Sequence, residues 1–232
     1  METFIRKELK YRISDAQKEK FLAAIADFIE PDLYPESNIY SIYLDTAQLD
    51  LLRICEGKPA FRQKVRIRAY QESTSPEDTV FFELKKKAEG VCMKSRSPFT
   101  LKNLCRFLSE PDGFDQNSKE LAHVLEQWPL EMRFALYAHR HCWKWKGRED
   151  LRITIDDTLT YRLCDLYLGK SKNDQPLLKE GENILEIKCA QNLPRQLAGI
   201  LFENSIQPAS FSKAGQVYAK LLERNQTLCR TI

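Results

Sequence analysis

The chain has 232 residues, of which 43% are hydrophobic, so it can bury one sizeable core and we expect a single domain over residues 1–232. A formal net charge of +3 excludes a general nucleic-acid coat, so we expect no specific nucleic-acid partner and look for local clusters of charge. No stretch approaches the roughly 20 apolar residues of a membrane span, and no signal-peptide run opens the chain. We therefore expect a cytoplasmic protein without an intrinsic membrane segment.

The first elements expected are a strand, a helix and a second strand. Over residues 6–11, charged side chains alternate with mostly apolar ones, which is typical of a half-buried strand. Ser14 and Gln17 form a capping-box pattern, and apolar residues then recur at helical spacing until Pro31. Alternation resumes over residues 38–46 and predicts the second strand.

The centre of the chain carries the strongest charge pattern. Residues 60–70 and 79–87 predict a strand pair in which cations and hydrocarbon alternate, and residues 91–99 predict a third strand. The cationic faces of these strands hold Arg62, Lys64, Arg66 and Arg68, then Lys85 and Lys87 beside Glu83, then Lys94 and Arg96. Like charges a few Å apart repel by roughly 1 kcal/mol per pair in water. Such a row is therefore either a solvated outer face or an anion site.

The second half of the chain predicts a helical insertion at about 100–128, followed by further strands. The extended stretch over residues 130–146 contains Arg140, among apolar and aromatic residues. The remaining elements are expected as strands over residues 151–157, 158–167 and 183–189, followed by two helices of which the second begins near Ser212 and Lys213. Seven cysteines without a CxxC pair favour reduced thiols over a disulfide framework.

These strands can be assembled in two ways. In the more usual one, the apolar faces fill a barrel or sandwich and the charges face water. In the other, a closed barrel places its apolar face outward under helices, and its charges line a tunnel. At least three amphipathic helices need an apolar surface, and roughly eight strands is near the number at which a barrel interior holds one small ligand. We therefore predict an α+β fold, an eight-stranded antiparallel β-barrel tunnel with a charged lumen and helices packed on the outside.

A set of short motifs, taken in order, resembles a known family. The motifs are Arg6-Lys-Glu8-Leu-Lys10-Tyr11, Val65-Arg66-Ile67-Arg68-Ala69-Tyr70, Phe82-Glu83-Leu84-Lys85, Lys94-Ser-Arg96, Arg152-Ile-Thr154-Ile-Asp156, Leu185-Glu186-Ile187-Lys188 and Phe211-Ser212-Lys213. Together they resemble the polyphosphate polymerase (VTC) domain of the triphosphate tunnel metalloenzymes, a CYTH-like superfamily. The resemblance implies a transferase that moves the terminal phosphoryl group of ATP to a growing polyphosphate chain, with Mn²⁺ or Mg²⁺.

The resemblance also implies roles for single residues. The phosphate ligands would be Lys10, Arg66, Arg68, Lys85, Lys94, Arg96, Arg140, Arg152, Lys188 and Lys213. Of these, Lys10, Arg66, Arg68 and Lys188 would be catalytic, and Glu186 and Glu8 would bind the metal. This inventory suits phosphoryl transfer, which requires positioning, cations and a metal but no nucleophilic side chain.

One departure from the wider superfamily bears on the reaction. Hydrolytic members carry a Glu-x-Glu-x-Lys pattern on the first strand, and here Arg6 replaces the first glutamate. This favours the polymerase, while a tunnel-type triphosphatase and a non-catalytic polyphosphate-binding module stay open as alternatives. The sequence carries neither the phosphate-sensing domain nor the membrane segments of the eukaryotic assemblies, so we expect a membrane or regulatory partner protein to supply such functions.

Other site patterns carry little weight in this sequence. His123, His139 and His141 lack the cysteine or carboxylate spacing of a zinc site, so we interpret His139 and His141 as a surface or packing pair. No Gly-x-Ser-x-Gly elbow and no GxxxxGK[ST] phosphate loop is present.

Overall fold

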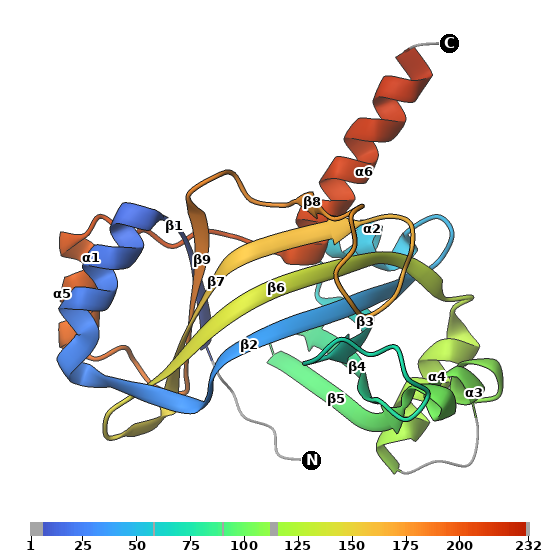
Figure 1. The fold of residues 1–232 in the computed structure, drawn as a ribbon, viewed down its shortest axis with the longest axis horizontal. Helices are drawn as coiled ribbons and strands as arrows, with labels where there is room; N and C mark the ends of the chain where they lie inside the picture. Colours follow the sequence, from blue (N-terminus) through green and yellow to red (C-terminus); the bar gives the residue numbers. More distant parts are fainter. Residues whose placement is uncertain (1–6, 58, 90, 112–115, 231–232) are drawn as a thin grey trace. The chain divides into compact units, whose positions relative to one another are not determined.

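A computed structural model gives the fold of residues 7–57, 59–89, 91–111 and 116–230. Arg6, the position that distinguishes the polymerase motif, lies outside these residues. Six α-helices and nine strands form the described part of the chain (Figure 1). The strands are β1 (Lys7–Ser14), β2 (Ile29–Asp45), β3 (Phe61–Ala69), β4 (Thr79–Ala88), β5 (Val91–Thr100), β6 (Glu131–Trp145), β7 (Arg148–Arg162), β8 (Gln175–Pro176) and β9 (Glu182–Cys189). The helices are α1 (Asp15–Ile25), α2 (Asp50–Glu56), α3 (Leu101–Ser109), α4 (Gln116–Gln127), α5 (Arg195–Glu203) and α6 (Lys213–Arg230).

The strands pair in the order β1-β9-β7-β6-β2-β3-β4-β5, and β8 pairs with β7. Every strand pair whose register is resolved is antiparallel. The predicted α+β class and antiparallel sheet are therefore confirmed. Over the described residues the strand path runs from β1 to β5 without closing, so the sheet is open there, whereas a closed barrel was expected.

The chain forms two compact units, and three long strands, β2, β6 and β7, contribute residues to both. The first unit comprises residues 1–38, 138–159 and 176–212, and the second comprises residues 39–137, 160–175 and 213–232. The number of independent domains stays a prediction. The helices α3 and α4, which occupy the expected insertion, belong to the second unit.

Each unit has its own apolar core, built from one face of its strands. In the first unit, Ile153 and Ile187 are fully buried together with apolar residues of α1 and α5, two helices that lie side by side (Figure 1). In the second unit, Ile67 is buried with apolar residues of α2, α3 and α4. The expectation that the apolar face of the strands lies under helices is confirmed for these three isoleucines, and the charged residues of the same strands occupy the opposite face.

The helix α1 begins as predicted and ends earlier than predicted. Ser14 accepts a hydrogen bond from the Gln17 backbone N–H, and the Gln17 side chain accepts one in return, which completes the capping box. The helix stops at Ile25, a 3-10 turn occupies Ala26–Phe28, and β2 starts at Ile29. Phe28 stacks on Trp145 with ring centroids 5.3 Å apart. Lys146 N–H also donates to the Phe28 carbonyl, which pairs this segment with the end of β6.

The two strands expected over residues 151–167 are a single strand, β7, which ends at Arg162. The Arg162 guanidinium is almost fully buried, donates to the carbonyls of Asp165 and Gly169 and forms an ion pair with Asp174 at 2.7 Å. This arginine therefore fastens the loop that follows β7. The six cysteines whose side chains are described are free thiols, as expected. Of the helices in the described ranges, none combines the length and the apolar character that a bilayer crossing requires.

Candidate functional site

In the second unit, one buried carboxylate is surrounded by four cations. Glu83 on β4 is 1% exposed. Its Oε2 lies 2.7 Å from Arg66 Nε and 3.9 Å from Arg68 Nε, both on β3. Its Oε1 lies 2.7 Å from Lys94 Nζ and 3.2 Å from Arg96 Nε, both on β5. One negative charge faces four positive ones, so these five residues, the Glu83 cluster, carry a formal excess of three positive charges.

The strand register produces the Glu83 cluster. Arg66 pairs with Glu83, and Glu83 pairs with Arg96, so the three residues form a row across β3, β4 and β5. Arg68 and Lys94 occupy adjacent rows on the same face. Residues paired across an antiparallel sheet have Cβ atoms about 5 Å apart, close enough for their side chains to meet. The charged side chains that alternate along each strand in the sequence therefore meet around Glu83.

Electrostatics hold the Glu83 cluster in its charged form. Burial alone would raise the pKa of Glu83, but Arg66, Arg68 and Lys94 outweigh it and lower this pKa to about 2. Burial lowers the pKa of Arg68, and the positive charge of Arg66 lowers it further. The cations therefore repel one another, and an additional anion would reduce that repulsion.

Neutral and aromatic side chains fix the cations in place. Arg66 donates to the Tyr43 hydroxyl at 3.2 Å, and the Arg96 guanidinium lies over the Phe81 ring, 3.6 Å from its centroid. Burial would raise the pKa of Tyr43, but Arg66 and Arg68 lower it to about 8. Tyr43 is thus a second group in the second unit that can become an anion next to Arg66.

Two further predicted phosphate ligands also lie in the second unit. Lys85 on β4 pairs with Lys94 of β5 and with Lys64 of β3, so it extends the cationic face by one row. Lys213 is the first residue of α6, as the sequence predicted, and is partly buried.

In the first unit, β1 and β9 form an alternating arrangement of charge. Glu8 pairs with Lys188, and Lys10 pairs with Glu186, so acid and base alternate both along and across the strands. Glu186 is 6% exposed. Its Oε1 lies 2.6 Å from Lys188 Nζ and its Oε2 3.9 Å from Lys10 Nζ, while Lys10 Nζ lies 2.9 Å from Glu8 Oε1. The formal charges of these two carboxylates and two ammonium groups therefore sum to zero.

The other two predicted arginines of the first unit have carboxylate partners. Arg140 on β6 donates from Nε and Nη2 to the two oxygens of Asp156 at 2.6 and 2.9 Å. Asp156 is 1% exposed, and although burial acts against it, this ion pair raises the pKa of Arg140. Arg152 on β7 pairs with Lys188 of β9 in the sheet, and its Nε lies 2.5 Å from Asp32 Oδ2.

The carboxylates Glu8 and Glu186 suit a hard divalent cation. They occupy diagonal positions on one face of the β1–β9 pair, within reach of a shared ligand. Mg²⁺ binds to one or two carboxylates and takes its other ligands from phosphate oxygens and water. These two side chains therefore fit an ion that arrives with a phosphate substrate.

The sequence did not predict the organising carboxylates Glu83 and Asp156 as site residues. Each is 1% exposed and binds arginine, Glu83 joining Arg66 and Arg68, and Asp156 holding Arg140. Their signal was an acidic residue on the cationic face of a strand. That signal becomes specific only when the strand register is known.

Several solved structures are similar to this chain. A candidate adenylate cyclase from Bacillus halodurans has a TM-score of 0.55 and 14% identity, covering 91% of this chain and 96% of its own. Another from Vibrio parahaemolyticus has a TM-score of 0.50 and 12% identity, covering 94% of this chain and 99% of its own. A Pyrococcus horikoshii protein has a TM-score of 0.49 and 14% identity, covering 93% and 99%. At these identities, the first two structures show a likeness of fold alone.

Comparisons of the sequence itself give one family. None of the curated proteins matches the chain. The family model of the VTC domain matches residues 5–222, which is nearly the whole chain. The chain therefore belongs to the VTC domain family, which its motifs predicted.

Proposed function

We propose that the protein is a metal-dependent polyphosphate polymerase, which transfers the terminal phosphoryl group of ATP to a growing polyphosphate chain. The observation that carries this proposal is the Glu83 cluster, in which four cations converge on one buried carboxylate with an excess of three positive charges. Such an excess in a partly desolvated face attracts a polyanion. Membership of the VTC domain family supports the same substrate class.

The arginines and lysines of the Glu83 cluster would bind the phosphate oxygens. Arginine offers a planar fork that binds phosphate through two hydrogen bonds, and lysine offers a compact charge. Phosphoryl transfer spreads negative charge over the equatorial oxygens, so cations fixed in advance lower the barrier without a nucleophilic side chain. Glu83 would keep Arg66 and Arg68 in position before substrate arrives, because it offsets part of their mutual repulsion.

In the first unit, Glu186 and Glu8 would hold a divalent metal, Mn²⁺ or Mg²⁺. When bound, the ion supplies positive charge to the phosphate oxygens during transfer. Lys10 and Lys188 form ion pairs with Glu186, and they would turn to phosphate oxygens when the carboxylate is shared with the metal. Both lysines are therefore proposed as catalytic, together with Arg66 and Arg68.

The remaining proposed phosphate ligands differ in how firmly protein groups hold them. Arg140 forms two hydrogen bonds to buried Asp156, so a phosphate would share this arginine with the carboxylate. Arg152 is 46% exposed beside Asp32, and Lys85 extends the cationic face of the second unit. Lys213 at the start of α6 would add its charge to the backbone donors of a helix N-terminus.

The direct test is to incubate the protein with ATP and Mn²⁺ or Mg²⁺ and to resolve the products. We expect long polyphosphate on a gel, with ADP and comparatively little free phosphate. ADP and phosphate in equal amounts would identify a triphosphatase. Triphosphate binding without either product would identify a binding module.

Two arginine substitutions connect the reaction to the Glu83 cluster. Arg66→Ala should weaken both triphosphate binding and turnover, because it removes contacts made in the ground and transition states. Arg53→Ala is the matched control, since Arg53 lies on α2, is 66% exposed and pairs with Asp50. Equal activity of the two variants would show that Arg66, and with it the Glu83 cluster, takes no part in the reaction.

A further inference from the structure

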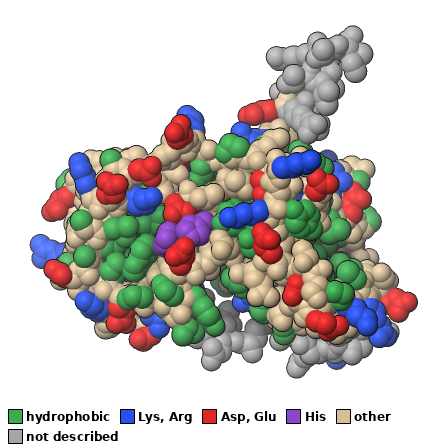
Figure 2. Space-filling model, in the orientation of Figure 1, with side chains coloured by type: hydrophobic (Ala, Val, Ile, Leu, Met, Phe, Trp, Pro, Cys, Tyr) green, Lys and Arg blue, Asp and Glu red, His purple; other side chains and the backbone are tan. Residues whose placement is uncertain are grey.

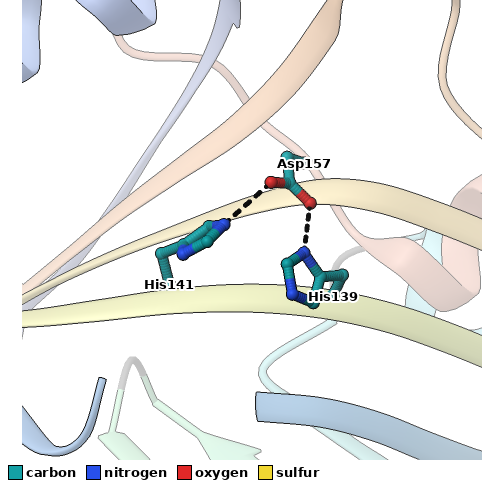
Figure 3. Close-up of side chains that lie close together, drawn as sticks. All are labelled: His139, His141 and Asp157. Carbon is teal, nitrogen blue, oxygen red and sulfur yellow. Dashed lines mark hydrogen bonds and ion pairs between the residues drawn. The ribbon is translucent and has the colours of Figure 1, made fainter. Parts of the chain in front are cut away.

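Two histidines and an aspartate of the first unit converge at the surface. Figure 2 shows histidine side chains grouped next to acidic and apolar ones. His139 and His141 extend from β6, and Asp157 of the neighbouring strand β7 lies between them (Figure 3). His139 Nδ1 lies 2.8 Å from Asp157 Oδ1, and His141 Nε2 lies 2.9 Å from Asp157 Oδ2. The sequence showed no carboxylate at zinc-site spacing, and the pairing of β6 with β7 supplies one.

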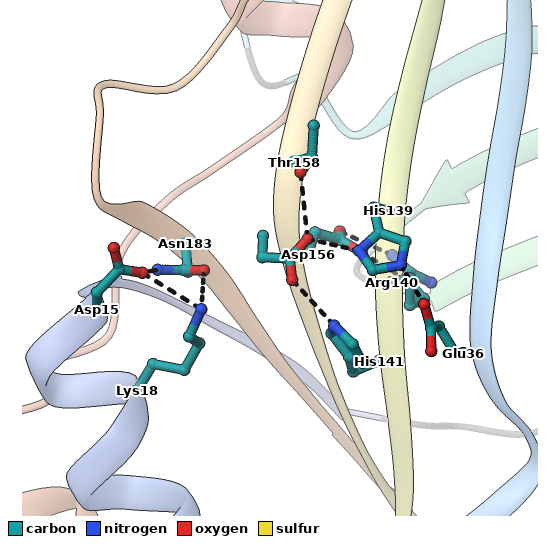
Figure 4. A network of polar contacts seen from close by, with 10 residues as sticks. Asp15, Lys18, Glu36, His139, Arg140, His141, Asp156, Thr158 and Asn183 are labelled. Carbon is teal, nitrogen blue, oxygen red and sulfur yellow. Dashed lines mark hydrogen bonds and ion pairs between the residues drawn. The ribbon is translucent and has the colours of Figure 1, made fainter.

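This group lies on the opposite face of the sheet from the proposed phosphate ligands of the same strands. Side chains alternate along a strand, so His139 and His141 share one face of β6, and Arg140 points to the other. On β7, Asp157 shares a face with the core residue Ile155, whereas Asp156 points to Arg140. Figure 4 shows both sets of contacts. The histidine group is therefore a separate feature from Arg140 and Asp156.

We propose that His139, His141 and Asp157 bind a divalent transition-metal ion of the Zn²⁺ class. Two imidazoles and one carboxylate are a ligand set that Zn²⁺ takes in proteins, with one position left for water. One donor atom from each residue lies within 4.8 Å of the other two. A tetrahedral ion with bonds of about 2.0–2.1 Å places its donors about 3.3 Å apart, so small side-chain rotations suffice.

The surroundings of the histidines support this assignment. His139 Nε2 lies 2.7 Å from Glu36 Oε1 of β2 (Figure 4). A metal-binding histidine usually donates its second N–H to a carboxylate, which fixes the ring and raises its basicity as a ligand. With Asp157 on one nitrogen and Glu36 on the other, His139 already has this arrangement.

A small pocket next to the group leaves room for the fourth ligand. It has a volume of about 120 Å³ and is lined by His141 and Asp157 together with Lys18, Leu22, Trp143 and Ile155. Lys18 is the cation among the described residues of this lining, and Asp15 and Asn183 lie 3.3 and 3.2 Å from its ammonium (Figure 4). A water bound to the ion would fit in this pocket, on the side away from Glu36.

The test is zinc binding by the full chain, measured by competition with a chromophoric chelator at about pH 8. We expect one Zn²⁺ per chain, and His141→Gln and Asp157→Asn should each weaken binding at least 10-fold. Glu36→Gln should weaken it about 10- to 100-fold, the usual effect of removing an outer carboxylate. His123→Gln is the matched control, because His123 is 62% exposed on α4, and it should bind zinc like the unaltered chain.

X-ray absorption of the zinc-loaded unaltered chain tests the ligands without any substitution. We expect a shell of nitrogen and oxygen at about 2.0–2.1 Å, including two imidazoles. The chain also has exposed thiols, at Cys92, Cys105 and Cys164, which bind zinc at about 2.3 Å. A sulfur shell, no bound zinc, or equal affinity of His141→Gln and His123→Gln would each overturn the proposal. None of these measurements depends on polymerase activity.

Discussion

The charged faces of the two units are built from the same residue types and differ in balance. On β1 and β9 of the first unit, Glu8 and Glu186 meet Lys10 and Lys188, so two acids face two bases. On β3, β4 and β5 of the second unit, Glu83 alone faces four cations. The first arrangement is neutral without a ligand, whereas the second requires an anion for balance.

Because the two faces differ in net charge, we expect them to bind different ligands. A neutral group of alternating charges can exchange an ammonium for a metal ion at a carboxylate, and so it suits the metal. A face with excess positive charge gains free energy from any bound polyanion, and so it suits the triphosphate. Removing an acid should therefore affect catalysis most in the first unit and stability most in the second.

The largest expected effect is on catalysis, from Glu186→Gln in the first unit. The substitution keeps the volume of the side chain and removes its charge, so turnover should fall on the order of 100-fold, equivalent to about 3 kcal/mol of transition-state stabilisation. Triphosphate binding should change little. The measurement is polyphosphate synthesis alongside triphosphate affinity, and Glu149→Gln is the control because Glu149 is 87% exposed. Full turnover in Glu186→Gln would show that this carboxylate does not bind the metal.

The next effect is on stability, from Glu83→Gln in the second unit. The pKa of Glu83 is lowered from 4.5 to about 2, so its ionised form stabilises the fold at pH values above 4.5, and this contribution is lost as the pH falls towards 2. At pH 7 the substitution should lower the free energy of unfolding by about 3 kcal/mol, since it leaves four cations without their counter-charge.

Added triphosphate distinguishes this electrostatic cause from a general loss of packing. A bound anion replaces the missing charge, so tripolyphosphate should raise the melting temperature of Glu83→Gln more than that of the unaltered chain. Glu120→Gln is the control, because Glu120 forms an ion pair with Lys86 and, among the residues that the structure describes, with no other cation. Equal shifts in all three proteins would contradict the role given to Glu83.

The sequence predicted what depends on local periodicity. The alternation on β3 placed Arg66 and Arg68 opposite Ile67, and Lys213 begins α6 as expected. It did not predict the first half of β2, because residues 29–38 are mostly exposed on both faces and show no alternation. The family match over residues 5–222 was also predicted from the order of the motifs.

The parts that the sequence did not predict depend on which strands pair and in what register. In the sequence, Glu83 is an acid next to lysines on its own strand. Only the strand register shows that the arginines of β3 and β5 lie on either side of it. Asp157 is 16 and 18 residues from the two histidines that it contacts, a separation that no helix or turn motif signals. The roles given to the individual site residues stay predictions.

A smaller effect should come from salt. The proposed attraction of triphosphate to the Glu83 cluster depends on charges that are partly exposed, Lys94 being 43% and Arg96 32% exposed. Mobile ions screen such charges over a Debye length of about 8 Å at physiological ionic strength. Triphosphate affinity, measured by calorimetry, should therefore fall steadily as salt is raised, and less steeply in Arg66→Ala. An affinity that does not respond to salt would contradict a charge-driven site.

The smallest expected effect is on the pH dependence of binding and comes from Tyr43. The pKa of this tyrosine is lowered from 10.0 to about 8, because Arg66 and Arg68 outweigh the effect of burial. Above pH 8 the phenolate adds a second anion beside Arg66 and reduces the positive excess of the cationic face. Triphosphate affinity of the unaltered chain should therefore fall a few-fold between about pH 7 and pH 9, in proportion to the charge lost.

Tyr43→Phe provides the comparison, since it keeps the ring that stacks on Phe134, with centroids 4.8 Å apart, and cannot ionise. Any ionisation of the ligand itself affects both proteins equally, so only the difference between them reports Tyr43. The unaltered chain should also show one tyrosine titrating near pH 8 by ultraviolet absorbance, and the variant should lack it. If the two proteins lose affinity in parallel, the phenol does not ionise next to Arg66 in this range. The positive excess of the second unit would then not change with pH in this range. If Tyr43 does ionise next to Arg66, the positive excess falls by one charge as the phenol loses its proton.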